Sequence, residues 1–347
     1  MAGNEFMVVR SCRVLVVTVM AAALLAACTD DSSTPKATGC PPAEPLDLRC
    51  GALWGITTQE PTQEALDGVE DEVGRQFDLV YRFHDLNDTV PDEQDLAAVE
   101  SGHLLHISIE SQDFSGDQPT GRTWADVASG MYDDQLRKQA KGIASINDPV
   151  FMTFDHEVDQ PARMALGTPA EFVAAWRHLH DIYEQEGATN AVWVWVILGW
   201  APSLHVAATL WPGNDYVDWI SWDIYNQSGC RGAGVEPGLA SSFEQDVRLV
   251  STWIHDVGPG IGMDPTKPWM ISEAGSALYP DDAAKTADWY TAIPDVLRDY
   301  PQIAAVTLWD HDGHLGCDYR FDQDPSITEA VAEAGQDSWV NKYEHHP

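Results

Sequence analysis

The stretch Phe151-Met152-Thr153-Phe154-Asp155-His156-Glu157 decides the fold class of this chain, because an apolar run ends there in a carboxylate. A second stretch, Trp269-Met270-Ile271-Ser272-Glu273-Ala274-Gly275, has the same form, and a proline lies shortly before each. Short apolar runs after turn residues are typical of strands buried on both faces in a parallel sheet. A carboxylate at the carboxyl end of such a strand lies where barrel enzymes hold their reactive groups.

Strand-like and helix-like patterns alternate through the rest of the chain, which indicates an α/β fold. Eight such units in roughly 300 residues predict a (β/α)8 TIM barrel. A doubly wound open sheet is the alternative, but no glycine-rich phosphate loop follows the first strand. The predicted strands are Gly51–Thr57, Leu79–His84, Leu104–Ile109, Val150–Glu157, Ala191–Leu198, Val217–Tyr225, Trp269–Glu273 and Ala304–Trp309.

Amphipathic stretches between these strands predict the helices. The segment Thr168-Pro169-Ala170-Glu171 combines a capping residue, a proline and an early acid, which together mark a helix start. The stretch Ala201–Asp215 is short and interrupted by prolines, so it is a poor helix candidate. The predicted helices are Gln63–Arg75, Asp92–Glu100, Trp124–Ser145, Pro169–Gln185, Ser242–His255, Asp282–Tyr300 and Pro325–Lys342.

The amino terminus predicts a lipoprotein signal peptide over residues 1–27. Arg10 and Arg13 precede an apolar segment, Val14–Leu25, that is too short for a comfortable membrane span. Leu25-Ala26-Ala27-Cys28 resembles the lipobox of bacterial lipoproteins, in which the cysteine carries the lipid. The alternative is an ordinary secretory signal. We therefore expect an extracytoplasmic protein, attached to the cell membrane through Cys28 or secreted.

Two further segments follow the signal. Residues 28–47 are polar and rich in proline, which predicts a flexible tether. Residues 48–347 then form a single barrel domain. Once Cys12 is removed with the signal and Cys28 carries the lipid, four cysteines remain, Cys40, Cys50, Cys230 and Cys317, and they suggest two disulfides outside the cytoplasm. Three pairings are possible, and we favour Cys40–Cys50 with Cys230–Cys317.

Charge and composition restrict the partners. The formal net charge is −36 and the sequence pI is near 4.3. Such a surface repels nucleic acid and anionic membranes, so membrane contact is expected only through the lipid anchor. The 14 tryptophans could serve core packing, but flat rings also stack on sugars in binding clefts. We expect a monomer that acts on a neutral substrate.

Alternation along each strand predicts which side chains share a face. If the strand-end residues face the barrel mouth, one pocket holds Glu157, Glu273, His84, Tyr225 and Trp309. Two acids on different strands are the minimal machinery for breaking a glycosidic bond. Strict alternation would point His156 away from this pocket unless the strand bends. Trp54 and Trp200 are further candidates for the pocket wall.

In its motifs, the chain resembles the β-mannanase-type enzymes of glycoside hydrolase family 26, in clan A of the retaining glycosidases. There the acid/base glutamate ends strand four directly after a histidine, as in His156-Glu157, whereas most of the clan has asparagine at that position. The nucleophile ends strand seven in a Pro-x-x-x-x-Glu-x-Gly context, as in Pro268 through Gly275. Further similarities lie in Asp133–Ala140, Val192–Trp195 and Pro212–Asp218.

The resemblance implies a retaining endo-β-glycanase, most simply a mannan endo-1,4-β-mannosidase. Glu157 is then the acid/base and Glu273 the nucleophile, Tyr225 holds Glu273, Trp309 forms the sugar floor, and His156 lies near the acid. This chemistry needs no metal or other cofactor. Asp310-His311-Asp312 is interpreted as a polar loop.

One departure from the family pattern leaves the substrate open. Family mannanases commonly place tryptophans shortly after the acid/base glutamate, but Val158–Met164 contains no aromatic residue. Mixed-linkage β-glucan and β-1,3-xylan are therefore alternative substrates. A binding-only surface lipoprotein and a transglycosylase that uses the same covalent intermediate are alternative functions.

Overall fold

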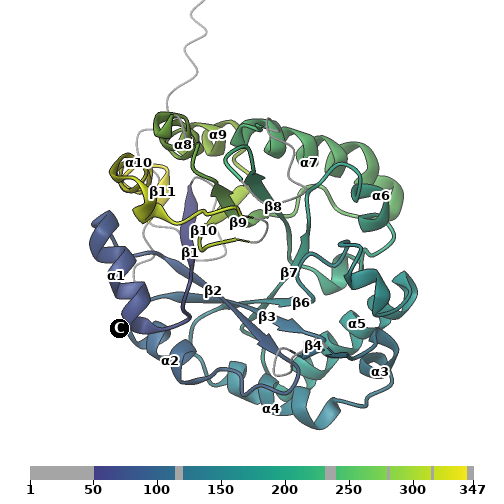
Figure 1. Ribbon diagram of the computed structural model, residues 1–347. Helices are drawn as coiled ribbons and strands as arrows, with labels where there is room; N and C mark the ends of the chain where they lie inside the picture. The colour runs from purple at the N-terminus through teal and green to yellow at the C-terminus, as the bar shows by residue number, and fades with distance from the viewer. Residues whose placement is uncertain (1–50, 114–119, 231–239, 280–281, 314–315, 342–347) are drawn as a thin grey trace, which may run out of the picture. The chain divides into compact units, whose positions relative to one another are not determined.

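The computed structural model describes residues 51–113, 120–230, 240–279, 282–313 and 316–341. Eight parallel strands form a closed barrel in the order β1-β2-β3-β6-β7-β8-β9-β10, and β10 pairs with β1 (Figure 1). This closure confirms the predicted TIM barrel and rules out an open doubly wound sheet. The strands are β1 (Ala52–Thr58), β2 (Leu79–Asp85), β3 (Leu104–Glu110), β6 (Val150–Phe154), β7 (Ala191–Ile197), β8 (Trp219–Asn226), β9 (Trp269–Ser276) and β10 (Ile303–Asp310).

Helices surround the barrel and connect its strands (Figure 1). They are α1 (Gln63–Val73), α2 (Glu93–Glu100), α3 (Trp124–Ala128), α4 (Asp133–Ala144), α5 (Pro169–Glu186), α6 (Leu204–Ala207), α7 (Phe243–Val257), α8 (Ala283–Thr291), α9 (Ile293–Asp299) and α10 (Pro325–Gly335). Short elements are β4 (Gln112–Asp113), β5 (Thr120–Gly121), β11 (Val340–Asn341) and the 3-10 turns Arg163–Ala165, Asn214–Tyr216, Gly258–Ile261 and Phe321–Gln323.

Local signals fix where α5 begins and ends. The Thr168 side chain accepts a hydrogen bond from the Glu171 amide, the Glu171 carboxylate caps Thr168 in return, and Pro169 is in the first turn. This is the capping box that the sequence predicts. At the other end Gly187 adopts a φ of 84°, a left-handed conformation that glycine reaches without strain.

Three predicted helices differ from the structure. The stretch Trp124–Ser145 forms two helices, α3 and α4, because Gly130 turns the chain with a φ of 85°. The stretch Asp282–Tyr300 also divides, into α8 and α9, since Pro294 cannot continue the hydrogen-bond ladder of α8. The predicted helix Pro325–Lys342 is too long: α10 ends at Gly335 and the chain returns to pair β11 with β1.

Two apolar layers build the core. One lies between the strands and the helices and includes Trp54, Val80, Trp222 and Ile271. The other fills the barrel and draws residues from every barrel strand, among them Leu53 of β1, Leu79 of β2 and Met270 of β9. Membership in one layer or the other therefore shows whether a strand residue faces the helices or the barrel interior.

The predicted signal peptide, the lipid-bearing Cys28, the tether and the Cys40–Cys50 disulfide lie outside the described residues, so these remain predictions. Among the helices that the structure describes, none has the length and apolar character needed to cross a membrane.

Candidate active site

The segment after β6 carries the first glutamate and does not continue the strand. The strand ends at Phe154, before the predicted end at Glu157, and both Asp155 and Glu157 adopt left-handed φ angles, of 52° and 50°. Such angles cost about 1–2 kcal/mol for each non-glycine residue. Strict alternation therefore does not hold after Phe154, and the bend turns His156 toward the barrel mouth, away from the direction that alternation predicts.

Buried hydrogen bonds hold this bent segment. Asp155 accepts from the Ser111 amide at 2.8 Å and from Trp124 Nε1 at 2.7 Å. Glu110, at the end of β3, accepts from the His156 amide at 3.1 Å and pairs with Arg163. The guanidinium of Arg163 also lies 3.5 Å from Asp155. Since Glu110 and Asp155 are almost fully buried, this one cation balances two desolvated carboxylates.

A β-bulge directs the second glutamate inward. The register between β8 and β9 shifts at this point, so that Trp222 pairs with Ile271 but Asp223 pairs with Glu273. Ile271 faces the helix layer and Met270 faces the barrel interior. Regular alternation would place Glu273 on the same face as Ile271, as the sequence pattern predicts, and that part of the prediction is wrong. The extra residue at the bulge returns Glu273 to the interior.

The two bends place His156 at the centre of a buried polar cluster. Its Nε2 lies 2.9 Å from Asp223 Oδ2 and 3.1 Å from Glu273 Oε1. Its Nδ1 lies 2.9 Å from the Tyr81 hydroxyl. The Tyr225 hydroxyl donates to Glu273 Oε2 at 2.5 Å, the contact that the sequence reading assigns to Tyr225. Strands β2, β6, β8 and β9 thus converge on one point.

Burial and neighbouring charges shift the pKa values of the groups in this cluster. Burial raises the pKa of Glu157 well above its ordinary value, and the negative charges of Asp223 and Glu273 add to that effect. Burial likewise raises the pKa of Asp223 to about 7. Burial alone would lower the pKa of His156, but Tyr81, Asp223 and Glu273 around it raise that pKa well above 6.5. The site therefore favours a protonated Glu157 beside an imidazolium.

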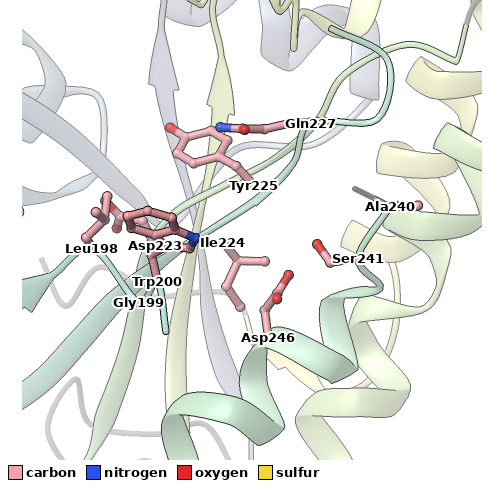
Figure 2. A pocket seen from close by; sticks show the side chains of 10 residues that line it. All are labelled: Leu198, Gly199, Trp200, Asp223, Ile224, Tyr225, Gln227, Ala240, Ser241 and Asp246. Carbon is pink, nitrogen blue, oxygen red and sulfur yellow. The ribbon is translucent and has the colours of Figure 1, made fainter. Parts of the chain in front are cut away.

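Aromatic side chains and a cavity border the cluster. The Phe83 ring lies 5.3 Å from the His156 ring and 6.3 Å from the Trp309 ring, which places Trp309 at the site as expected. A cavity of about 380 Å³ adjoins Asp223 and Tyr225. Figure 2 shows Trp200 on the Asp223 side of this cavity, and 59% of Trp200 is exposed, enough to receive a flat ligand.

Two predicted wall residues lie elsewhere. His84 shares the outer face of β2 with Val80 and Arg82, and its Nε2 lies 2.9 Å from Asp95 Oδ2 at the start of α2. Trp54 shares the outer face of β1 with Ala52 and Ile56 and is completely buried under the helices. Both predictions are wrong. For His84 the predicted alternation with Val80 and Arg82 is correct, but this face of β2 is the outer one.

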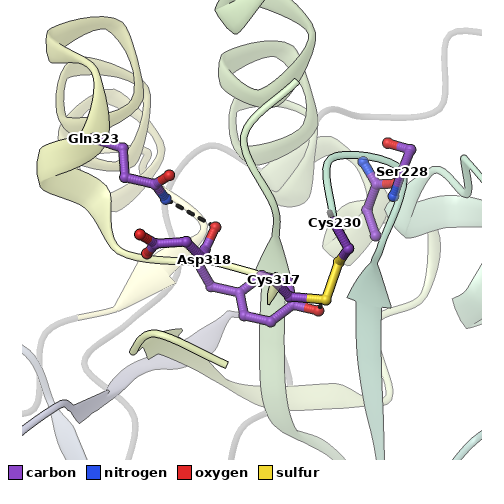
Figure 3. Close-up of a disulfide and its surroundings, with 7 residues drawn as sticks. Ser228, Cys230, Cys317, Asp318 and Gln323 are labelled. Atoms are coloured by element: carbon purple, nitrogen blue, oxygen red, sulfur yellow. Dashed lines mark hydrogen bonds between the residues drawn. A yellow bond between two sulfur atoms is a disulfide. The ribbon is translucent and has the colours of Figure 1, made fainter. Parts of the chain in front are cut away.

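A disulfide closes one side of the site. Cys230, after β8, is bonded to Cys317, after β10, so this part of the predicted pairing is confirmed (Figure 3). Tyr319 lies beside the bridge, and its ring centroid is 4.8 Å from that of Tyr225. The bridge therefore supports the wall against which Tyr225 packs.

The structure adds residues that the sequence did not single out. Asp223 lies on the same face of β8 as Tyr225, and the sequence analysis assigns it no role. The prediction of His84 on the inner face of β2 points Tyr81 outward, which is why Tyr81 is not among the predicted residues. One signal in the sequence could have identified Asp223. It is a carboxylate two residues before Tyr225, so alternation places it on the same face as that predicted site residue.

Within the part of the chain that the structure describes, two groups of side chains have donor atoms within 4.8 Å of one another and so could hold a metal ion. One is His156, Glu157 and Asp223 in the cluster itself. The other is His84, Asp92 and Asp95 on the far side of β2.

Comparisons with known proteins agree with this geometry. No protein-family model matches the chain. The chain is 24% identical to Endoglucanase H of Acetivibrio thermocellus over 302 residues. The matched region covers 83% of this chain and 30% of that protein. The chain is also 25% identical to a β-1,3-xylanase of a Vibrio species over 107 residues. That matched region covers 30% of this chain and 23% of the xylanase. The chain thus spans less than a third of each relative.

Solved structures give the same fold. An endo-β-1,4-mannanase of glycoside hydrolase family 26 from Cellulomonas fimi has a TM-score of 0.61 at 16% identity, covering 84% of this chain and 72% of that one. A family 26 β-mannanase from Bacteroides ovatus has a TM-score of 0.58 at 15% identity. The superposition covers 84% of this chain and 92% of that one. These comparisons confirm the predicted likeness to family 26 and to glycoside hydrolases as a class.

Proposed function

We propose that this chain is a β-glycanase of the family 26 type, which hydrolyses a neutral polysaccharide by double displacement with retention at the anomeric carbon. The observation that carries the proposal is the convergence of Glu157 and Glu273 on His156 from the ends of β6 and β9. Each glutamate reaches this point through a break in regular strand geometry. Backbone strain of this kind is concentrated at functional sites, because the surrounding structure must hold it in place.

The raised pKa of Glu157 suits it to be the general acid. Glu157 would give its proton to the glycosidic oxygen as the bond from that oxygen to C1 breaks, while Glu273 forms a new bond to C1. Glu157, now ionised, would take a proton from water, the hydroxide oxygen would bind C1, and Glu273 would leave as a carboxylate. The Tyr225 hydroxyl would hold one oxygen of Glu273 so that the other faces the sugar.

We propose β-1,4-mannan as the substrate, because several solved structures of similar fold are named β-mannanases. Trp309 at the cluster and Trp200 at the edge of the cavity supply flat surfaces for sugar rings. Glucan or β-1,3-xylan is the second candidate. The relatives by sequence are named an endoglucanase and a β-1,3-xylanase, and the segment after Glu157 carries no aromatic residue.

Release of reducing ends from a panel of polymers tests the proposal. The purified protein is incubated with galactomannan, glucomannan, lichenan, β-1,3-xylan and cellulose, beside its Glu273→Ala variant. We expect release on one polymer, with mannan first, and a loss of at least about a thousandfold in the variant. Proton NMR of the first product anomer then distinguishes retention from inversion.

The other outcomes identify the alternative functions. Release that is equal in Glu273→Ala would contradict the assigned nucleophile. Binding of a polymer without release would favour a binding-only protein, and longer oligosaccharide products in place of shorter ones would favour a transglycosylase.

We further propose that a lipid on Cys28 holds the protein at the outer surface of a cell membrane. The basic and apolar segments before Cys28 motivate this proposal. The Cys28→Ala variant should lose incorporation of labelled palmitate and leave the membrane fraction. Retention of the label in that variant would contradict the anchor.

A further inference from the structure

A second cavity lies on the outer side of β2, separate from the catalytic cluster. It measures about 270 Å³ and lies between the segment that begins α1 and the segment that begins α2. Pro61 and Thr89 are at its edge, and its polar lining comes from Arg82, His84, Asp88, Asp92, Gln94 and Asp95. All of these residues belong to the part of the chain that the structure describes.

Arg82 distinguishes this cavity from an ordinary surface depression. Only 4% of Arg82 is exposed, and its Nε and Nη2 atoms are buried with no hydrogen-bond partner among the described residues. Asp95 is fully buried, and its Oδ1 atom also has no hydrogen-bond partner there. Buried polar groups are almost always hydrogen-bonded, so each open donor and acceptor calls for an explanation. A ligand that both accepts and donates would satisfy the two side chains together.

The charges in the cavity identify the kind of ligand. Arg82 and His84 face three carboxylates, those of Asp88, Asp92 and Asp95. The His84 ring lies between two of them, with Nε2 2.9 Å from Asp95 Oδ2 and Nδ1 3.8 Å from Asp88 Oδ2. A metal ion would have to approach the guanidinium, and an anion would have to approach the three carboxylates, so this mixed lining disfavours an ionic ligand. Hydroxyl groups accept from a guanidinium and donate to a carboxylate, so an uncharged polyol fits this arrangement.

Size and position narrow the ligand further. A volume of about 270 Å³ suits a ligand of about one sugar ring. Phe83, next to Arg82 in β2, also lines the cavity, and its ring lies 5.3 Å from the His156 ring and 6.3 Å from the Trp309 ring. A single strand thus separates the cavity from the catalytic cluster.

We propose that this pocket binds one uncharged sugar unit of the polysaccharide, a branch or outer unit that passes over the end of β2. The assignment of the ligand as a sugar rests on the proposed glycanase function. Arg82 would donate to its hydroxyl oxygens, and Asp92 and Asp95 would accept from its hydroxyl groups. The pocket would then discriminate among polymers by the branches or sugar units that lie at a distance from the cleaved bond.

Titration calorimetry with a hydrolysis-deficient protein tests the pocket. The full chain carrying Glu273→Ala is titrated with mannohexaose, cellohexaose and a galactosylated mannopentaose. Thr89→Trp is added to fill the pocket entrance from an exposed loop, and Thr252→Trp on the exposed face of α7 is the matched control. We expect Thr89→Trp to weaken the tightest of the three ligands by about tenfold or more. The control should keep its affinity within about twofold.

Arg82→Leu provides a second variant. It removes the hydrogen-bond donors of Arg82 that have no partner among the described residues, whereas Thr89→Trp fills the volume of the pocket. It should lose affinity to a similar extent, and circular dichroism shows whether it is folded. If it does not fold, Thr89→Trp alone decides the matter. A crystal of Glu273→Ala soaked with the tightest ligand should show a sugar ring within hydrogen-bond distance of Arg82.

Three results would overturn the proposal in different ways. Equal affinities for Thr89→Trp and its control, with a ligand bound in the cleft, would remove the pocket and leave the glycanase function intact. Absence of any binding or hydrolysis would remove both. Thermal stabilisation by Ca²⁺, Mn²⁺ or Zn²⁺ that disappears in Asp92→Asn, which keeps a good helix cap, would assign the pocket to a metal ion instead.

Discussion

At the scale of single residues, the arrangement around His156 determines what the site can do. An imidazole between Asp223 and Glu273, with Tyr81 on its other nitrogen, is held at a fixed angle and favours its charged form. The imidazolium offsets part of the repulsion among three carboxyl groups in one buried volume. The raised pKa of Glu157 favours its protonated form, which is the form that the proposed general acid needs.

Removing the hydroxyl of Tyr225 tests the hydrogen bond to the proposed nucleophile. Tyr225→Phe keeps the ring packed against Tyr319 but loses the donor to Glu273 Oε2. A hydrogen bond to a charged group contributes about 1.5–3 kcal/mol, so we expect kcat to fall about 10- to 100-fold. Steady-state kinetics on the best polymer measures this. An unchanged kcat would mean that Glu273 needs no such support.

Removing the charge of Asp223 tests the control of the acid. As the proposed general acid, Glu157 would have to be protonated, so activity should decline as the pH rises through its pKa. The charge of Asp223 raises that pKa, and Asp223→Asn should therefore move the alkaline limb of kcat/KM to lower pH. Asp246→Asn removes another carboxylate of the same cavity, at a place away from the cluster (Figure 2), and should leave the limb where it is. A limb that moves upward in Asp223→Asn would contradict the assignment.

At the scale of elements, the site depends on where strands stop being regular. Strand β6 ends early and turns through two left-handed residues, and β9 inserts one extra residue opposite β8. Both departures occur at the carboxyl end of the barrel. Each is held from outside the strand concerned, the first by Glu110 and Arg163 and the second by pairing with β8.

Replacing Arg163 tests how much the first of these bends relies on its cation. Arg163→Met leaves Glu110 and Asp155 buried beside each other without a positive charge. Breaking a buried ion pair from one side costs about 3–5 kcal/mol, and we expect a loss of that size in the free energy of unfolding. Denaturant titration measures it, with exposed Arg248→Met as a control that should lose less than about 1 kcal/mol. Equal losses in both variants would show that the cluster contributes little.

At the scale of the whole molecule, closure of the barrel brings together groups that are far apart along the chain. The pairing of β10 with β1 completes the ring, and the Cys230–Cys317 bridge joins two loops that are separated by 87 residues. Because Tyr319 packs between this bridge and Tyr225, the closure of the barrel also supports the residue that donates to Glu273, the proposed nucleophile.

Removing the bridge should affect stability and activity together. The double variant Cys230→Ser with Cys317→Ser frees the unfolded chain of a long closed loop, which lowers the free energy of unfolding by about 2–5 kcal/mol. We also expect a lower kcat at temperatures where the variant is still folded, since the wall behind Tyr225 is loosened. Unfolding curves and kinetics on the same preparation measure both. A variant that loses stability but keeps its full kcat would confine the bridge to a structural role.

The sequence by itself determined the barrel, both strand-end glutamates and one disulfide. Each of these is encoded locally, in apolar runs that end in a carboxylate, in the alternation of strand and helix patterns, and in cysteine spacing. The capping box of α5 was likewise readable from four consecutive residues, because a helix cap is satisfied within a single turn.

Only the tertiary structure decided which face of each strand is the inner one. Alternation gives two faces but not their direction, so His84 and Trp54 were assigned to the wrong side while Tyr81 was missed. The bend at Asp155 and the bulge before Glu273 were also invisible, since neighbouring strands impose them and no local pattern records that influence. Burial then set the protonation of Glu157 and Asp223, because desolvation exists only once the chain has closed around them.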